Sequence, residues 1–270
     1  MLTRIISAIV GIVALMYIIN AGGWIFFLSI CLLNIFAMYE LYKAFQKKGV
    51  HITFFLNSIS TAILLYYISF YNDFNFIWVS FLIFLLIMLE CMYGIINNNR
   101  NHIINTVYTV FSFVYTTLLF MFFILVRNLP NGINFIWWIF ITTWACDTGA
   151  FFTGIYFGKN PLAPHISPNK TIEGSLGGVV LSIIASIIFT RFFISEISIL
   201  HAIILGILIG SISQIGDLSA SLIKRYCKIK DFSNIIPGHG GILDRLDSAL
   251  FSFPIAYIYI MTILEKGGLP

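Results

Sequence analysis

About nine apolar runs, each close to the length that crosses a lipid bilayer, follow one another along this 270-residue chain. A membrane helix needs roughly 20 mostly apolar residues, because the hydrocarbon core is about 30 Å thick. Hydrophobic residues make up 59% of the chain, well above the soluble range of about 45–50%. We therefore predict an all-α, polytopic integral membrane protein. The expected spans are 5–21, 23–41, 52–71, 76–96, 106–126, 133–153, 176–194, 200–220 and 248–265.

The basic residues are distributed unevenly between the two sides of this expected membrane. One side carries Arg4, Lys43, Lys47, Lys48, Arg100, Lys159, Lys170, Lys224, Arg225, Lys228, Lys230 and Arg245. The other side carries Arg127, Arg191 and Lys266. Because Lys and Arg favour cytoplasmic loops, the richer side is predicted to be cytosolic. The net charge of +4 is small and scattered, which argues against a nucleic-acid-binding protein.

Acidic residues inside apolar runs are costly unless they meet a polar cavity or a partner. Glu40 and Glu90 lie towards the cytosolic ends of their runs, and we interpret them as interfacial carboxylates near Lys43 or Arg100. Their part in any functional site stays open. The same holds for Asp147, which forms a shorter polar stripe with Thr143 in the sixth run, followed by Gly149 and Gly154.

Asp217 belongs to a polar stripe in the eighth run. Its members recur at three- and four-residue steps and so share one helix face: Ser213, Asp217, Ser221 and Lys224. Gly206 and Gly210 in the same run allow a neighbouring helix to pack closely. The stripe leads into a charged loop, so Asp217 is expected to face that loop.

The loop between residues 221 and 247 is the most densely charged part of the chain. Asp244 and Asp247 are three residues apart at the expected start of the last helix, and such neighbouring hard oxygen ligands suit Mg²⁺. Gly238, Gly240 and Gly241 precede them and are expected to turn backbone amides outward, as an anion site at a helix N-terminus. Carboxylates for a metal, beside cations and amides for phosphate, indicate phosphoryl chemistry.

A second loop, HISPNKTIEGSLGG at residues 165–178, has the same character. It supplies the cation Lys170, together with Ser167, Thr171 and Glu173, just before several glycines. The chain contains no GxxxxGK[ST] sequence, so a P-loop is excluded.

Residues 221–247 read SLIKRYCKIKDFSNIIPGHGGILDRLD. This stretch resembles, position by position, the C-terminal signature of the CDP-diacylglycerol synthase (phosphatidate cytidylyltransferase) family. DTGAFFTGIYFGK and SPNKTIEG look like the family's other two landmarks, and length and span count are similar to its bacterial members. Asn169 stands where the family has a second lysine, and Ile172 where an aromatic residue is more usual.

The resemblance implies that CTP and phosphatidic acid react to CDP-diacylglycerol and pyrophosphate with Mg²⁺, among membrane lipids at the cytosolic face of the bacterial inner membrane. It implies N-terminal membrane helices over residues 1–130 and a catalytic region over residues 131–270 of a single membrane domain. The implied catalytic residues are Asp217, Lys224, Arg225, Lys230, Asp231, His239, Asp244, Arg245 and Asp247. The implied cofactor-binding residues are Ser167, Lys170, Thr171, Glu173, Gly238, Gly240 and Gly241. The expected metal ligands are Asp217, Asp244 and Asp247.

Two alternatives fit parts of the same sequence. A CTP-dependent kinase of a polyprenol or phytol would use a related nucleotide site but transfer the γ-phosphoryl group. An ion-coupled transporter would use Asp147 and Asp217 as a relay and would not need the charged loop. The sequence also leaves open whether the protein forms a homodimer.

Overall fold

The structure, a computed structural model, describes residues 2–71, 75–99, 102–236, 238 and 240–265. It divides into two compact units. The first contains Met1–Asn128 and Cys227–Arg245, and the second contains Leu129–Tyr226 and Leu246–Pro270. The expected division near residue 130 lies close to the first boundary. Residues 227–245, which the sequence assigned to the C-terminal region, instead group with the N-terminal helices.

Helices make up nearly all of both units. The elements up to the first boundary are α1 (Leu2–Ala21), α2 (Gly23–Gln46), α3 (Phe54–Phe70), α4 (Phe76–Ile96), α5 (His102–Phe113), the π-helical turn η1 (Val114–Leu118) and α6 (Leu119–Arg127). The later elements are α7 (Gly132–Phe157), β1 (Pro161–Ala163), β2 (Ser167–Thr171), α8 (Ile172–Phe193), α9 (Ile199–Tyr226), α10 (Leu243–Tyr259) and the π-helical turn η2 (Ile260–Glu265).

Seven helices within the described residues are long and apolar enough to cross a membrane. They are Gly23–Gln46, Phe76–Ile96, His102–Arg127, Gly132–Phe157, Ile172–Phe193, Ile199–Tyr226 and Leu243–Leu264. Two other expected spans correspond to shorter apolar helices, Ile9–Ala21 and Phe54–Phe70. The prediction of an all-α, multi-pass membrane protein is confirmed, whereas the count of nine spans is not.

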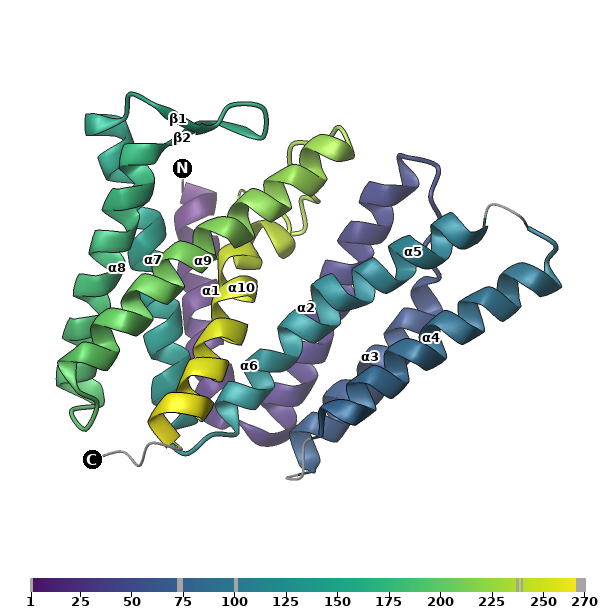
Figure 1. Ribbon diagram of the computed structural model, residues 1–270, viewed down its shortest axis with the longest axis horizontal. Coiled ribbons are helices and arrows are strands. Elements are labelled where there is room, and N and C mark those ends of the chain that lie inside the picture. The colour runs from purple at the N-terminus through teal and green to yellow at the C-terminus, as the bar shows by residue number, and fades with distance from the viewer. Residues whose placement is uncertain (1, 72–74, 100–101, 237, 239, 266–270) are drawn as a thin grey trace. The chain divides into compact units, whose positions relative to one another are not determined.

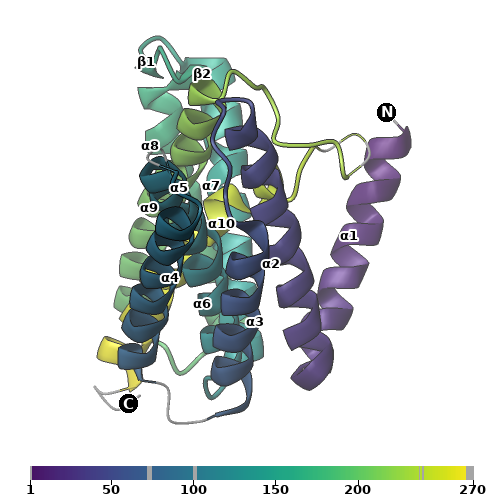
Figure 2. The same cartoon turned by 90° about the vertical axis from the view of Figure 1, so that its right-hand side faces the viewer.

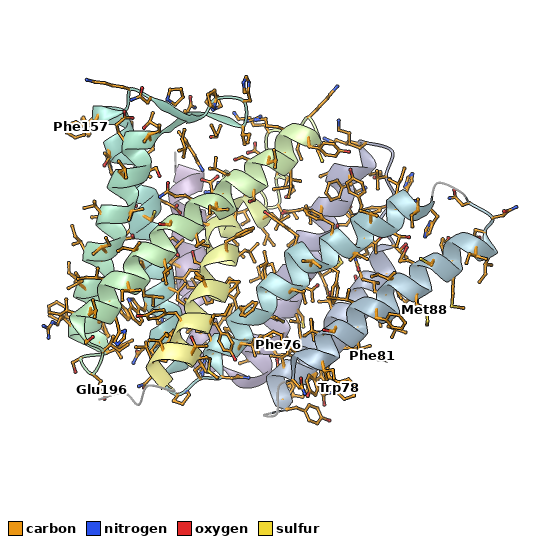
Figure 3. The ribbon with its side chains drawn as sticks, in the orientation of Figure 1. Phe76, Trp78, Phe81, Met88, Phe157 and Glu196 are labelled. Atoms are coloured by element: carbon orange, nitrogen blue, oxygen red, sulfur yellow. The ribbon has the colours of Figure 1, made fainter. Side chains whose placement is uncertain are left out.

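The outer surface of α4 carries large apolar side chains. Phe76, Trp78, Phe81 and Met88 point away from the ribbon in Figure 3, and each is between 40% and 54% exposed. Large apolar side chains turned outward in this way are stable only against an apolar surrounding such as the acyl chains of a bilayer.

In the first unit, α2 packs against α3, and the two run side by side in Figure 2. Several polar side chains inside this unit form hydrogen bonds between helices, which stabilises polar groups where water is excluded. Asn57 Nδ2 donates to the carbonyl oxygen of Thr109 at 3.0 Å, and the Thr61 and Thr117 hydroxyls are 2.7 Å apart. These bonds tie α3 to the helical stretch formed by α5, η1 and α6.

In the second unit, α7, α8 and α9 lie side by side with small residues between them (Figure 1). A Cβ atom at Gly206 of α9 would lie 2.7 Å from the Cα of Ile183 in α8. The Ser182 hydroxyl of α8 donates to the Gly206 carbonyl at 2.8 Å. Such contacts require small residues, so Gly206 and Gly210 allow close helix packing as expected.

A short β-hairpin joins α7 to α8, at one end of the second unit (Figure 1). Strands β1 and β2 are antiparallel, with Pro161 opposite Thr171 and Ala163 opposite Ser167. The sequence predicted only a loop here, because the strands are three and five residues long and show no apolar alternation. The hairpin fixes where the residues of the SPNKTIEG motif lie.

Candidate functional site

A cavity of about 560 Å³ lies within the second unit, beside the hairpin. Part of its wall is polar and carries Asp147 of α7, Lys170 of β2 and Asp217 of α9. Another part is apolar and carries Phe151 and Ile155, both from the end of α7 near the hairpin. One cavity therefore offers charged groups and an oily surface together.

Lys170 and Asp217 form an ion pair within this cavity. The Lys170 Nζ atom lies 2.5 Å from Asp217 Oδ2, and the two side chains are 27% and 33% exposed. The Ser221 hydroxyl lies 3.5 Å from the other oxygen, Asp217 Oδ1. The expected polar stripe of α9 is thus confirmed where Asp217 meets Ser221, and its carboxylate meets the cation of the second motif.

Two further carboxylates lie near this pair. The Asp247 carboxylate is close enough to those of Asp217 and Asp147 to be repelled by both, and is attracted by Lys224. Ser248 bridges the cluster, since its hydroxyl donates to Asp147 Oδ1 at 3.3 Å and its amide donates to Asp247 Oδ1 at 2.8 Å. Mutually repelling carboxylates are stabilised by a cation.

The donor chemistry of this cluster fits Mg²⁺, which prefers carboxylate oxygens. Within the residues that the structure describes, no three His, Cys, Asp or Glu side chains are close enough together to enclose a metal ion. Asp147, Asp217 and Asp247 thus offer the oxygen ligands that Mg²⁺ prefers, although their carboxylates are not close enough together in this structure to enclose an ion.

The other residues of the hairpin motif have structural partners. Thr171 caps α8, because its hydroxyl accepts the Gly174 amide at 3.1 Å. The Glu173 carboxylate accepts the amides of Lys159 and Asn160 at 3.1 and 3.2 Å, and the Asn160 side chain at 2.7 Å. Thr171 also lines the cavity. Glu173 instead stabilises the segment that leads into the hairpin through these hydrogen bonds. Ser167 lies at the beginning of β2.

The basic residues at the end of α9 lie near the same hairpin. Arg225 Nε donates to the Ile166 carbonyl at 3.1 Å, which ties the helix end to the hairpin turn. Lys224 lies near enough to Asp247 to stabilise its carboxylate electrostatically. Arg225 is thus bonded to the hairpin that borders the cavity, and Lys224 precedes it in the last turn of α9.

The remaining signature residues belong to the first unit. Asp244, at the start of α10, is 8% exposed. Its Oδ2 atom accepts the Phe232 amide at 2.9 Å and the Gly241 amide at 3.0 Å. The sequence predicted that the Gly241 amide points outward and binds a phosphate. This prediction is wrong, because the amide donates to the Asp244 carboxylate of the protein itself. The Asp244 carboxylate thus accepts the amide of a residue three positions earlier, similar to the bond of an acidic side chain in a capping box.

Glu40 of α2 binds the next two amides. Its Oε1 accepts the Ile242 amide at 2.8 Å and the Ser233 hydroxyl at 2.5 Å, and its Oε2 accepts the Leu243 amide at 2.8 Å. The side chain is 1% exposed, so its interpretation as an interfacial carboxylate near Lys43 is wrong. The positive end of α10 attracts it inward.

Glu90 corrects the sequence interpretation in the same way. It is completely buried, and its Oε2 lies 3.0 Å from both His102 Nε2 and Thr53 Oγ1. A buried carboxylate needs such partners, because its charge has lost its water. The bonding partners of Glu90 are residues of the first unit and its carboxylate is buried, so Glu90 does not lie at the membrane–water interface.

The other loop residues differ in their surroundings. Gly238 and Gly240 have φ angles of 78° and 86°, which favour glycine. The charged side chains of Lys230, Asp231 and Arg245 are exposed. His239 lies outside the described residues. Exposed cations around a fixed backbone remain suited to a phosphate ligand, although the amides of Gly241, Ile242 and Leu243 are directed at carboxylates.

Sequence reasoning missed the importance of Glu40 and left Asp147 open. Glu40 gave no usable signal, because its bonding partners lie 193–203 residues away. Asp147 gave a weak one, since it begins the DTGAFFTGIYFGK stretch that was recognised as a landmark. The cavity shows that this landmark contributes a carboxylate as well as helix-packing glycines.

Comparison with known proteins identifies the family of this chain. The profile of the Cytidylyltransferase family matches residues 2–263. A protein named phosphatidate cytidylyltransferase from Staphylococcus saprophyticus is 31% identical over 266 residues, which cover 97% of this chain and 100% of the relative. Proteins of the same name from Staphylococcus haemolyticus and Bacillus subtilis are 32% and 29% identical, over 97% and 95% of this chain and 99% and 96% of their own lengths. The chain therefore belongs to the cytidylyltransferase family.

Proposed function

We propose that this membrane protein is a phosphatidate cytidylyltransferase, which makes CDP-diacylglycerol from CTP and phosphatidic acid. The observation that carries the proposal is the cavity of the second unit, where Lys170 and Asp217 share the wall with Phe151 and Ile155. A lipid phosphate needs a charged contact for its head group and an apolar one for its chains. The name of the relatives supports the same substrate pair.

In the proposed reaction, a phosphate oxygen of phosphatidic acid attacks the α-phosphorus of CTP. A new P–O–P bond forms, the bond from the α-phosphorus to the oxygen bridging to the β-phosphate breaks, and pyrophosphate leaves. Both substrates are anionic, so their approach requires cations. Lys170 in the cavity and Lys224 and Arg225 beside it would bind phosphate oxygens and hold the two reacting groups together.

Mg²⁺ is proposed as the cofactor. Asp217 and Asp247 would hold it, with Asp147 beside them, because their carboxylates interact in one cluster. Asp244, which the sequence spacing also suggested as a ligand, belongs to the first unit, where its carboxylate accepts the Phe232 and Gly241 amides. When bound, the ion would neutralise phosphate charge at the reacting centre.

The protein is proposed to lie in the inner membrane of a bacterial cell. Its active site is proposed to face the cytosol. In the second unit, Lys170 of the hairpin and Arg225, which is bonded to the hairpin turn, lie at the same end. Arg191 lies in the last turn of α8, at the end remote from the hairpin. A concentration of Lys and Arg at one end supports a cytosolic orientation of that end.

The test is an assay of the purified protein in detergent with Mg²⁺, phosphatidic acid and CTP labelled either in the cytosine or in the γ-phosphate. Cytosine label in the lipid product and γ-label in pyrophosphate are expected. Transfer of the γ-label to lipid would instead identify a CTP-dependent lipid kinase. The mass of the active species in detergent would determine whether it is a monomer or a homodimer.

A further inference from the structure

We infer that Glu40 of α2 is a positioning residue for the signature loop, defined here as residues 227–245. Its carboxylate holds the N-terminus of α10 and so fixes the backbone that carries the exposed cations Lys230 and Arg245. This role rests on the proposed function, because the loop matters for turnover only if it contacts the substrates.

The contacts of Glu40 are specific to this loop. Both carboxylate oxygens accept backbone amides of adjacent residues, Ile242 and Leu243, at 2.8 Å each. The Ser233 hydroxyl adds a third donor from the other arm of the loop. One side chain therefore bonds the beginning of α10 to the segment that precedes the Pro-Gly-His-Gly-Gly turn. A carboxylate at the positive end of a helix makes such bonds stronger than a neutral acceptor would.

Asp244 completes the same arrangement. It accepts the amides of Gly241 and Phe232, so three successive amides, from residues 241 to 243, are bound by two carboxylates. These donors would otherwise form an anion site of the kind found at helix N-termini. The protein fills that site with its own anions, the carboxylates of Glu40 and Asp244.

Gly241 provides independent support. Its φ angle is not among the positive values of this chain, so backbone conformation does not require glycine at this position. A Cβ atom there would instead collide with Glu40, at 2.7 Å from Cδ and 2.8 Å from Oε2. The space that Gly241 leaves is therefore occupied by the Glu40 carboxylate.

The first experiment compares Glu40→Gln with Glu90→Gln. Both positions are buried carboxylates of the first unit, but Glu90 bonds to His102 and Thr53, and neither of these belongs to the loop. Gln at position 40 would turn an NH₂ group towards one of the two amides. In Glu40→Gln we expect at least tenfold faster hydrogen exchange of the Ile242 and Leu243 amides and at least tenfold lower kcat. Both effects should be smaller in Glu40→Asp, which keeps the carboxylate.

Glu90→Gln should leave hydrogen exchange in the loop unchanged, and thermal unfolding of both variants reports any general loss of stability. Parent-like exchange and parent-like kcat in Glu40→Gln would overturn the inference. An inactive parent protein would refute the proposed function instead, while the exchange comparison would still test the contacts of Glu40.

The second experiment stays informative if Glu40→Gln does not fold. Gly241→Ala should reduce turnover at least tenfold, because its new methyl group meets Glu40. Adding Glu40→Asp shortens the opposing side chain by one methylene and should restore activity several-fold. If Gly241 were needed for the approach of a nucleotide, shortening Glu40 would restore nothing, and that result would contradict the assignment.

Discussion

The Lys170 ammonium in β2 lies 2.5 Å from the Asp217 carboxylate in α9, and both side chains line one cavity. Each is about a third exposed or less, so water weakens their attraction. Such partly exposed ion pairs contribute about 0–1 kcal/mol to stability. A phosphate group can therefore replace Asp217 as the partner of Lys170 at little cost, which makes the pair suited to substrate binding.

Lys170→Met should lower kcat/KM for CTP or phosphatidic acid at least tenfold, equivalent to about 1.4 kcal/mol. The reason is the loss of the one lysine that lines the cavity in the described part of the chain. Steady-state assays with each substrate varied in turn will show which phosphate Lys170 binds. Lys159→Met is the matched control, since Lys159 is exposed just before the hairpin and bonds to Glu173 through its backbone amide, which the substitution keeps. Equal losses in the two variants would assign the effect to general surface charge.

Removal of divalent ions should abolish turnover, and an excess of Mg²⁺ should restore it. Asp217→Asn keeps the shape of the side chain but removes its charge, so turnover should fall by about two orders of magnitude or more if the carboxylate holds the ion. Mg²⁺ titrations of activity will test both statements. Glu196, which Figure 3 labels, lies in the turn between α8 and α9 and is exposed. Glu196→Gln therefore serves as a control for the loss of an exposed carboxylate. Full activity after chelation would exclude the proposed cofactor.

Gly206→Ala should destabilise the second unit. The added methyl group would meet the backbone of Ile183, whose Cα lies 2.7 Å from the ideal Cβ position and cannot rotate aside. Overpacking of this kind costs about 1–3 kcal/mol. Thermal unfolding in detergent measures the effect, and Gly11→Ala is the control because nothing lies within 4 Å of a Cβ atom there. Similar unfolding temperatures for Gly206→Ala and the parent would show that α8 and α9 separate easily.

The parts of this molecule that the sequence predicted follow from local periodicity. Apolar runs are about as long as the bilayer is thick, and the Ser213 to Lys224 stripe repeats at helical spacing, so both can be recognised without a partner. The β-hairpin could not, because strands of three and five residues have too little alternation. The burial of Glu40 could not either, since it depends on which amides of a distant loop need an acceptor.

The bond between Glu40 and Leu243 also sets an order for synthesis of the protein. Their positions are 203 residues apart, so at about 5–20 residues per second the ribosome needs about 10–40 s to produce the second partner after the first. During this time α2 is already available for insertion, with the acidic Glu40 near its C-terminal end. The first unit contains residues 227–245 and so can be completed only after most of the second has been translated. If translation stops before residue 227, the nascent chain contains the N-terminal helices of the first unit but lacks residues 227–245.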